Sequence, residues 1–310
     1  MIENFLTVGT QVLELFLLIA VGYLCGKIGM LTEEGARSIT DIVLYIVTPC
    51  VIVENFIRPF DPAMLSGLLT AAAAALLIHG ATIGIAYAAF HHKVPEKNRV
   101  YRFALIFSNC GYMSLPMQQA IVGPDGVFFG AVYIVVFNIV LWTFGVVLSC
   151  GDKKALSPKK IFLNPCLIGM ALGLVLFLFS LPVPEIVHKP ISFLAALNTP
   201  LPMMIVGFYL SKSHLPDAFR DKRGYLCVFF RLIAVPMIAL GGMMLCGVRD
   251  TILITCVIAA GAPAAAATTM FAAKFRNDAE LSVRLVTLST LLSVITMPLV
   301  VGFAQTIGSA

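Results

Sequence analysis

Charged residues are scarce in this sequence, and this scarcity limits the class of protein. Asp, Glu, Lys and Arg together make up 12% of the 310 residues, against roughly 25% in a typical soluble protein. Apolar side chains make up 59%, which is more than one core could bury while leaving a wettable exterior. The composition excludes a cytosolic enzyme, a disordered regulator and a secreted disulfide scaffold. It indicates a protein that crosses a membrane several times.

Catalytic and metal-binding motifs are missing as well. The eight cysteines are scattered without a C-x-x-C motif, nearly all in apolar runs, and we interpret them as small packing residues. The chain has no H-E-x-x-H, no Gly-x-Gly-Asp and no Walker motif. The N-terminus has no basic region before a cleavage site, so we interpret it as the first membrane helix. We expect neither enzyme activity nor a bound metal or cofactor.

Long apolar runs dominate the chain, and ten of them reach the roughly 20 residues that a membrane helix needs. They are 6–27, 37–58, 63–90, 100–123, 126–150, 165–182, 190–211, 223–247, 250–274 and 280–305. The longest polar connector is 151–164, which divides the chain into residues 1–150 and 165–310 with five predicted helices each.

Basic residues fall mostly on one side of these helices. Loops on one side carry 17 of the 21 Lys and Arg residues, and loops on the other side carry three. This asymmetry predicts that the connector is cytoplasmic and that both termini lie outside. We expect the chain to reside in the cell (inner) membrane. The net charge of +5 therefore reports orientation and gives no support for a nucleic-acid partner.

The two halves share short motifs, and the members of each pair are separated by nearly the same number of residues along the chain. The matching pairs are Thr48-Pro49 with Thr199-Pro200, Gly22 with Gly173, and Pro116 with Pro263. Each pair relates one predicted helix to the fifth helix after it. Because five is an odd number, the halves would insert in opposite orientations, which is the inverted repeat common in secondary transporters.

The fourth and ninth predicted helices are interrupted near the predicted bilayer midplane. Residues 108–116 read Ser-Asn-Cys-Gly-Tyr-Met-Ser-Leu-Pro, and Gly261 and Pro263 interrupt the ninth helix. Proline frees backbone groups, which at that depth must be satisfied by protein or by a water-filled cavity. The prolines could simply kink two ordinary helices. The symmetric pairing instead favours two broken helices whose inner N-termini meet and attract anions.

The predicted crossing contains no acidic residue. Residues 103–123 and 251–273 lack Asp and Glu, whereas a cation antiporter would be expected to place carboxylates there. The candidate groups are neutral, and together they favour a substrate that bears a carboxylate. They are Asn109, Gly111, Ser114, Gln118, Asn138, Gly261, Thr268 and Thr269.

Four further polar residues lie within predicted helices. Arg231 needs a carbonyl or carboxylate partner, or it attracts an anionic substrate. His79 could couple transport to protons, or it is a hydrogen-bonded packing residue. Glu14 is a weaker functional candidate, and Glu54 is interpreted as an interfacial residue.

The residues resemble the auxin efflux carrier family of membrane transporters, in its short bacterial form, over essentially the whole chain. The resemblance rests on the ten-helix plan and on four motifs. These are Ser108-Asn109-x-Gly111-x-x-x-Leu115-Pro116, Asn138 followed by Trp142-Thr143 and Gly145, Thr199-Pro200-Leu201, and the Ala-rich run around Gly261-x-Pro263.

The resemblance implies an all-α fold similar to bile-acid symporters and sodium/proton antiporters. A scaffold of helices 1, 2, 6 and 7 would lie beside a transport domain of helices 3–5 and 8–10. It implies elevator-type transport of a small organic anion such as malate or malonate. Asn109 and Asn138 would contact its carboxylate, Pro116 and Pro263 would mark the crossover, and the protein would be a homodimer.

Two alternatives to this carrier remain open. One is a sodium-coupled organic anion symporter of the bile-acid type, which the missing carboxylates at the crossing disfavour. The other is a non-transport membrane receptor, which is disfavoured because the loops leave little room for a sensor or output domain.

Overall fold

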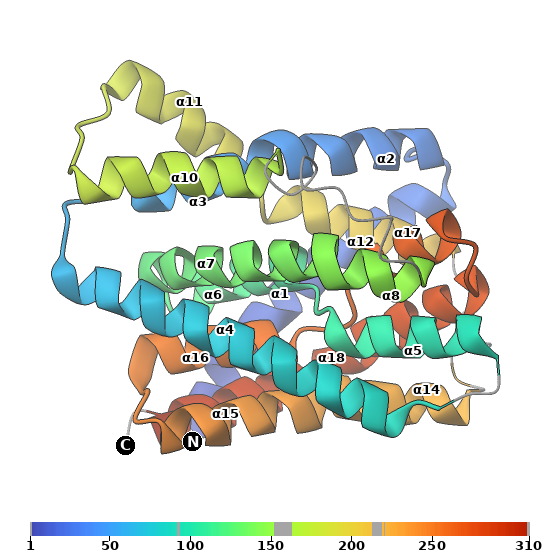
Figure 1. Ribbon diagram of the computed structural model, residues 1–310. Helices are drawn as coiled ribbons and strands as arrows, with labels where there is room; N and C mark the ends of the chain where they lie inside the picture. Colours follow the sequence, from blue (N-terminus) through green and yellow to red (C-terminus); the bar gives the residue numbers. More distant parts are fainter. Residues whose placement is uncertain (1, 92–93, 152–162, 213–218, 220, 309–310) are drawn as a thin grey trace.

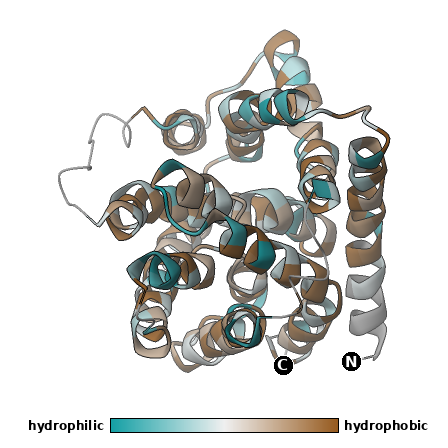
Figure 2. Cartoon of the chain, turned by 90° about the vertical axis from the view of Figure 1, so that its right-hand side faces the viewer, coloured by the Kyte–Doolittle hydropathy of each residue, from teal (hydrophilic) through white to brown (hydrophobic). Residues whose placement is uncertain are grey.

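The structure is a computed structural model that describes residues 2–91, 94–151, 163–212, 219 and 221–308. In these ranges the regular structure is helical, apart from one isolated β-bridge. Most of the helices run side by side along the long axis of Figure 1, and Figure 2 shows many of them nearly end-on. The start of the first helix and the end of the last lie at the same end of the molecule.

The first half contains four uninterrupted or kinked helical stretches and one broken one. The stretches are α1 (Ile2–Lys27); α2 (Glu33–Ile42), η1 (Val43–Val47) and α3 (Thr48–Phe56); α4 (Pro62–Ala89); α5 (Pro95–Ile106), η2 (Cys110–Ser114) and α6 (Leu115–Ile121); and α7 (Pro124–Val140), η3 (Leu141–Gly145) and α8 (Val146–Cys150). The η elements are single π-helical turns. The predicted connector 151–164 lies mostly outside the described residues, because 152–162 are not described.

The second half has a similar set of helices. It consists of α10 (Pro165–Leu178); α11 (Glu185–Ala196) and α12 (Pro200–Lys212); α14 (Lys222–Phe229), the π-helical η5 (Phe230–Ala234) and α15 (Val235–Leu245); α16 (Asp250–Gly261) and α17 (Ala267–Lys274); and α18 (Ala279–Gly308).

Several helices begin at polar side chains that cap them. A side-chain oxygen accepts a hydrogen bond from the first-turn N–H groups of α2, α4, α10 and α14. The caps are Thr32, Asp61, Asn164 and Asp221. These N–H groups have no partner inside the helix, so the caps fix where the chain turns into helix.

Six helical stretches in the described residues are long and apolar enough to cross a membrane: 33–56, 62–89, 124–150, 185–212, 222–245 and 279–308. Two shorter apolar helices are Pro165–Leu178 and Asp250–Gly261. The all-helical prediction is confirmed to this extent. Large apolar side chains also face outward, with Leu245 91% exposed and Ile186 84% exposed. Apolar side chains exposed in this way, together with the long apolar helices, are typical of a protein embedded in lipid.

The tightest helix pair is α1 with α12. A Cβ atom at Gly22 would collide with the backbone of Met204, and one at Gly207 would collide with the backbone of Ile19. Glycine at both positions lets the two backbones touch, as small residues do between membrane helices. The same relation joins α10 to α3, where Gly173 lies against the Phe56 side chain and Gly169 against Pro49.

Candidate functional site

Two helical stretches are broken in the middle of the molecule. The helix α5 ends at Ile106, and the π-helical turn η2 begins only at Cys110. The helix α16 ends at Gly261, and α17 begins at Ala267. Both predicted helices, 100–123 and 250–274, are thus divided into an entering half, an irregular segment and a second half.

The two irregular segments cross and pair through their backbones. The N–H of Asn109 donates to the carbonyl oxygen of Pro263 over 2.7 Å, and the N–H of Ala265 donates to the carbonyl oxygen of Phe107 over 2.9 Å. Ser108 and Ala264 lie between these bonds as an antiparallel bridge. Each broken helix therefore satisfies backbone groups that the other would leave unpaired, as a low-dielectric interior requires.

The two prolines of the sequence prediction occupy different places. Pro263 lies within its irregular segment, and its carbonyl takes part in the crossing. Pro116 lies in the first turn of α6, beyond Ser108 and the whole of η2. Because η2 continues into α6 without a break, Pro116 lies inside the second half of the helix and not at its start. The interruption of the fourth helix is therefore at residues 107–109 and not at Pro116.

A buried arginine joins the ends of the two entering half-helices. Arg231 of η5 is 2% exposed. Its guanidinium donates to the carbonyl oxygens of Leu105 over 2.6 Å and Ile106 over 3.4 Å in α5, and also to that of Ala260 in α16. Helix C-termini carry partial negative charge, so one positive group offsets both. Of the two roles weighed for Arg231, the structure shows carbonyl pairing.

Several neutral candidates gather at the crossing and at the start of the second halves. Asn109 is 7% exposed, and its side chain makes no capping hydrogen bond to η2. The hydroxyl of Ser114 lies 3.5 Å from the carbonyl oxygen of Ile258. Thr268 lies in the first turn of α17 and is 1% exposed, and its hydroxyl has no hydrogen-bond partner among the described residues. The crossing thus holds buried amide and hydroxyl groups beside two helix N-termini.

The other neutral candidates are less closely tied to the crossing. Gly261 ends α16, and Thr269 and Gly111 are partly buried near the two N-termini. Asn138 lies in α7, where its amide donates to the carbonyl of Ile134 over 2.9 Å and accepts from Asn164 over 3.1 Å. Asn138 therefore connects α7 with the start of α10 in this conformation.

His79 and Glu14 lie in other surroundings. His79 of α4 is 2% exposed, with Nδ1 2.7 Å from the carbonyl oxygen of Ala75 and the ring 5.4 Å from the ring of Tyr133. Glu14 is exposed on α1. Neither residue appears among those that form the crossing.

A cavity of about 870 Å³ opens beside α6, which belongs to the second half of the first broken helix. Its walls come from α3, from α6, and from the first turns of α4 and α7. The turn between α11 and α12 closes the remaining side. Its polar lining includes Glu54, Arg58, Gln119, His188 and Asn198. The loops 57–61 and 179–184 mark this end at the left of Figure 1.

Sequence reasoning missed most of this lining. Asn198 directly precedes the repeated Thr199-Pro200 motif, and that position was the available signal. Glu54 was interpreted as interfacial, and the structure adds that it faces the cavity. His188 comes from α11, far from α6 in the chain, so no spacing rule joins it to this cavity.

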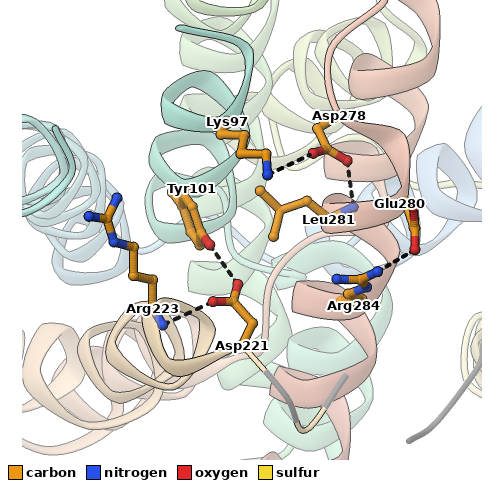
Figure 3. Close-up of a pocket in the computed structure, with 8 residues that line it drawn as sticks. All are labelled: Lys97, Tyr101, Asp221, Arg223, Asp278, Glu280, Leu281 and Arg284. Atoms are coloured by element: carbon orange, nitrogen blue, oxygen red, sulfur yellow. Dashed lines mark hydrogen bonds and ion pairs between the residues drawn. The ribbon is translucent and has the colours of Figure 1, made fainter. Parts of the chain in front are cut away.

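A second, smaller cavity of about 370 Å³ lies at the opposite end, among the starts of α5, α14 and α18. Figure 3 shows that most of its charged side chains pair with a neighbouring side chain. The Tyr101 hydroxyl donates to Asp221 over 2.5 Å, Lys97 lies 3.9 Å from Asp278, and Arg284 pairs with Glu280. We interpret this network as a link between helix ends.

A helical membrane protein whose two interrupted helices cross in this way has the architecture of a transporter. Residues 7–157 and 153–301 match the model of the membrane transport protein family. The chain belongs to this family, the auxin efflux carriers, and the resemblance noted from the sequence is confirmed.

Similar proteins come from archaea and yeast. An uncharacterized transporter of Methanothermobacter thermautotrophicus is 25% identical over 93% of this chain and 95% of its own length. One from Methanocaldococcus jannaschii is 26% identical over 74% of this chain and 76% of its own length. A shorter match is to an uncharacterized transporter of Saccharomyces cerevisiae. The two sequences are 32% identical over a segment that makes up 24% of this chain and 12% of the yeast protein. All three relatives are described as transporters, and the chain is a multi-pass membrane transport protein.

Proposed function

We propose that this protein is a secondary active transporter of a small organic anion, a carboxylate, that works by elevator-type alternating access. The observation that carries the proposal is the crossing itself. Two second halves of broken helices begin beside each other, next to buried amide and hydroxyl groups. No acidic side chain occurs at residues 103–123 or 251–273. Helix N-termini with neutral donors suit a carboxylate and offer little to a bare cation.

The proposed fold is ten transmembrane helices in a five-plus-five inverted repeat. The antiparallel direction of the Ser108–Ala264 bridge supports it, because equivalent helices of an inverted repeat run in opposite directions. Helix packing supports it too. The equivalent glycines Gly22 and Gly173 both lie at close helix contacts, the first between α1 and α12 and the second between α10 and α3.

In this proposal α1, α2–α3, α10 and α11–α12 form the scaffold, and the remaining helices form the transport domain. The distribution of basic residues among the loops supports a topology with both termini outside and the connector in the cytoplasm. The proposed location is the inner membrane of the cell. The larger cavity then opens outward, between scaffold helices α3 and α11 and transport helices α6 and α7. A cavity at the boundary between two bodies that move relative to each other is where a substrate would enter.

The proposed ligands of the carboxylate are Asn109, Ser114, Thr268 and Thr269, with Gly111 and Gly261 allowing close backbone approach. Asn138 would join them if its hydrogen bond to Asn164 opens during the cycle. Protons are the proposed coupling ion, and a homodimer is the proposed assembly. A strict requirement for sodium would favour the bile-acid type of symporter instead.

The test is substrate binding and counterflow with purified protein. A thermal-shift screen of mono- and dicarboxylates identifies a ligand, and counterflow of that labelled ligand in proteoliposomes separates a carrier from a receptor. Asn109→Ala should weaken binding about ten- to hundredfold, because a hydrogen bond to a charged group contributes about 1.5–3 kcal/mol. Asn277→Ala is the matched control, since Asn277 binds the Ser149 carbonyl far from the crossing. Unchanged affinity and transport in Asn109→Ala would remove Asn109 from the site.

A further inference from the structure

The larger cavity has an excess of negative charge on its lining. Three carboxylates, those of Glu54, Asp61 and Asp125, face one guanidinium, that of Arg58; the imidazole of His188 is counted as neutral. The formal sum is therefore two negative charges. A route of this sign repels a dianion and concentrates cations, which is unexpected for the entrance of a carboxylate carrier.

The one arginine of the cavity is already occupied. Arg58 donates to Asp125 over 2.6 Å, and its guanidinium lies 4.6 Å from the centre of the Phe128 ring. Asp61 is occupied as well, because its carboxylate caps α4 by accepting from the N–H of Ala63 over 2.8 Å. Arg58, Asp125 and Asp61 therefore all have partners within the protein, and Glu54 is the remaining charged residue of the lining.

The Glu54 carboxylate is half-buried and makes no hydrogen bond or ion pair with any described residue. A second unsatisfied acceptor lies in the same cavity. Asn198 is 5% exposed, and its side-chain oxygen receives no hydrogen bond within the described ranges. The Asn198 oxygen is shielded from water, which is unfavourable without a partner. The Glu54 carboxylate is open to the cavity and is therefore available to a ligand. Two acceptors on facing elements, one of them charged, match a ligand that carries several N–H donors and a positive charge.

The cavity also reaches the second half of the broken helix. Leu115 and Pro116 of α6 line it, and Ser114, a proposed carboxylate ligand, immediately precedes them. A ligand that enters between α3 and α11 therefore approaches the crossing from the side on which Glu54 lies.

We infer that the transported carboxylate also carries an ammonium group, so that the substrate class is amino acids and not dicarboxylates, and that Glu54 determines this specificity. This inference rests on the proposed function. The carboxylate would bind at the crossing, while the ammonium group would be recognised by Glu54 and the Asn198 carbonyl. Discrimination would combine attraction of the ammonium group with repulsion of a second carboxylate.

The experiment compares two series of compounds matched in length. Straight-chain dicarboxylates from malonate to adipate are set against amino acids in which an amine replaces one carboxyl group, such as β-alanine and 4-aminobutyrate, with α-amino acids added. Thermal shifts and competition against labelled counterflow are measured on the full-length protein. We expect the amino acids to bind and the dicarboxylates of the same length to bind at least tenfold more weakly.

The variant Glu54→Gln tests the residue. This substitution removes the charge with little change in shape. It should lower the affinity for the preferred amino acid about tenfold or more. It should also reduce the difference in affinity between that amino acid and the dicarboxylate of the same length. Glu185→Gln is the control, since Glu185 is an exposed residue of α11 that pairs with Lys189 and does not line the cavity. It should leave both affinities unchanged.

Three outcomes would overturn the inference. The first is preference of the unaltered protein for dicarboxylates, and the second is binding of neither series. The third is a Glu54→Gln variant that keeps the wild-type preference and loses only a pH dependence, which would assign Glu54 to proton transfer. If dicarboxylates bind and counterflow requires Asn109, the proposed carrier function stands without the inference. If no carboxylate of any kind is bound or exchanged, the carrier function itself fails.

Discussion

The backbone N–H of Asn109 donates a 2.7 Å hydrogen bond to the carbonyl oxygen of Pro263. These residues belong to different halves of the chain, and the bond forms where both helices are unwound. The crossing is therefore a directly bonded unit, and Arg231 adds a second connection between the same two helices.

The first prediction concerns that second connection. Arg231→Met leaves carbonyl groups of Leu105, Ile106 and Ala260 without their donor, so the protein should lose about 2–4 kcal/mol of stability. Arg231→Lys should lie in between, because one ammonium group cannot reproduce the geometry of a guanidinium. The measurement is thermal unfolding in detergent. Arg223→Met is the control, since Arg223 is an exposed basic residue in the first turn of α14. Equal melting temperatures for the two Met variants would contradict the bridging role.

The second prediction compares a glycine packed against a neighbouring helix with a glycine that faces open space. Gly207→Ala places a methyl group against the backbone of Ile19 and should cost about 1–3 kcal/mol by overpacking. Gly80→Ala introduces the same methyl group into open space on α4 and should be neutral or stabilise by up to about 1 kcal/mol. Thermal unfolding of the two variants in parallel checks the sign. Similar destabilisation at both positions would contradict the assignment of the cost to the α1–α12 contact.

The third prediction concerns the charged network of Figure 3. Tyr101→Phe removes the hydroxyl that donates to Asp221, the residue that caps α14, and should destabilise the protein by about 1–2 kcal/mol. Tyr45→Phe removes a hydroxyl from a side chain that is 63% exposed, and it should have no measurable effect. Ligand affinity should stay unchanged in both variants. A Tyr101→Phe variant that unfolds normally but binds its substrate more weakly would move this network into the transport site.

The fourth prediction separates coupling from binding at His79. If His79 carries the coupling proton, His79→Gln should abolish accumulation of substrate driven by a pH gradient and retain counterflow, which needs no gradient. His188→Gln is the comparison at a histidine that lines the larger cavity. Normal gradient-driven accumulation in His79→Gln would leave this residue with a packing role, held by the Ala75 carbonyl.

Composition and apolar run length predicted the helical membrane class, because hydrocarbon leaves a spanning chain few ways to satisfy its backbone. The crossing was harder to place. Proline was taken as a mark of the interruption, yet Pro116 lies inside the continuous run of η2 and α6, and the unwound segment lies earlier, at residues 107–109. A proline removes one backbone donor and can kink a helix without unwinding it, so sequence alone did not locate the break.

The partners of polar residues depended on tertiary structure and were not predictable. Arg231 was expected to need a partner, but its carbonyl partners on α5 and α16 become neighbours only after packing. Glu54 gave the same difficulty. Its cavity is lined by helices from both halves of the chain, and no local pattern indicates that the side chain lacks a partner.

The single π-helical turns have a consequence for which side of a helix meets which neighbour. Each π turn adds a residue to the helix, and one residue corresponds to roughly 100° around an α-helix. After η1, the chain therefore presents a rotated face, and Pro49 and Phe56 meet the glycines of α10. Deleting one residue from η1 would rotate α3 back and point other side chains at Gly169 and Gly173. The extra residue thus acts as an adjustment of phase, which lets one membrane helix pack correctly against two sets of neighbours along its length.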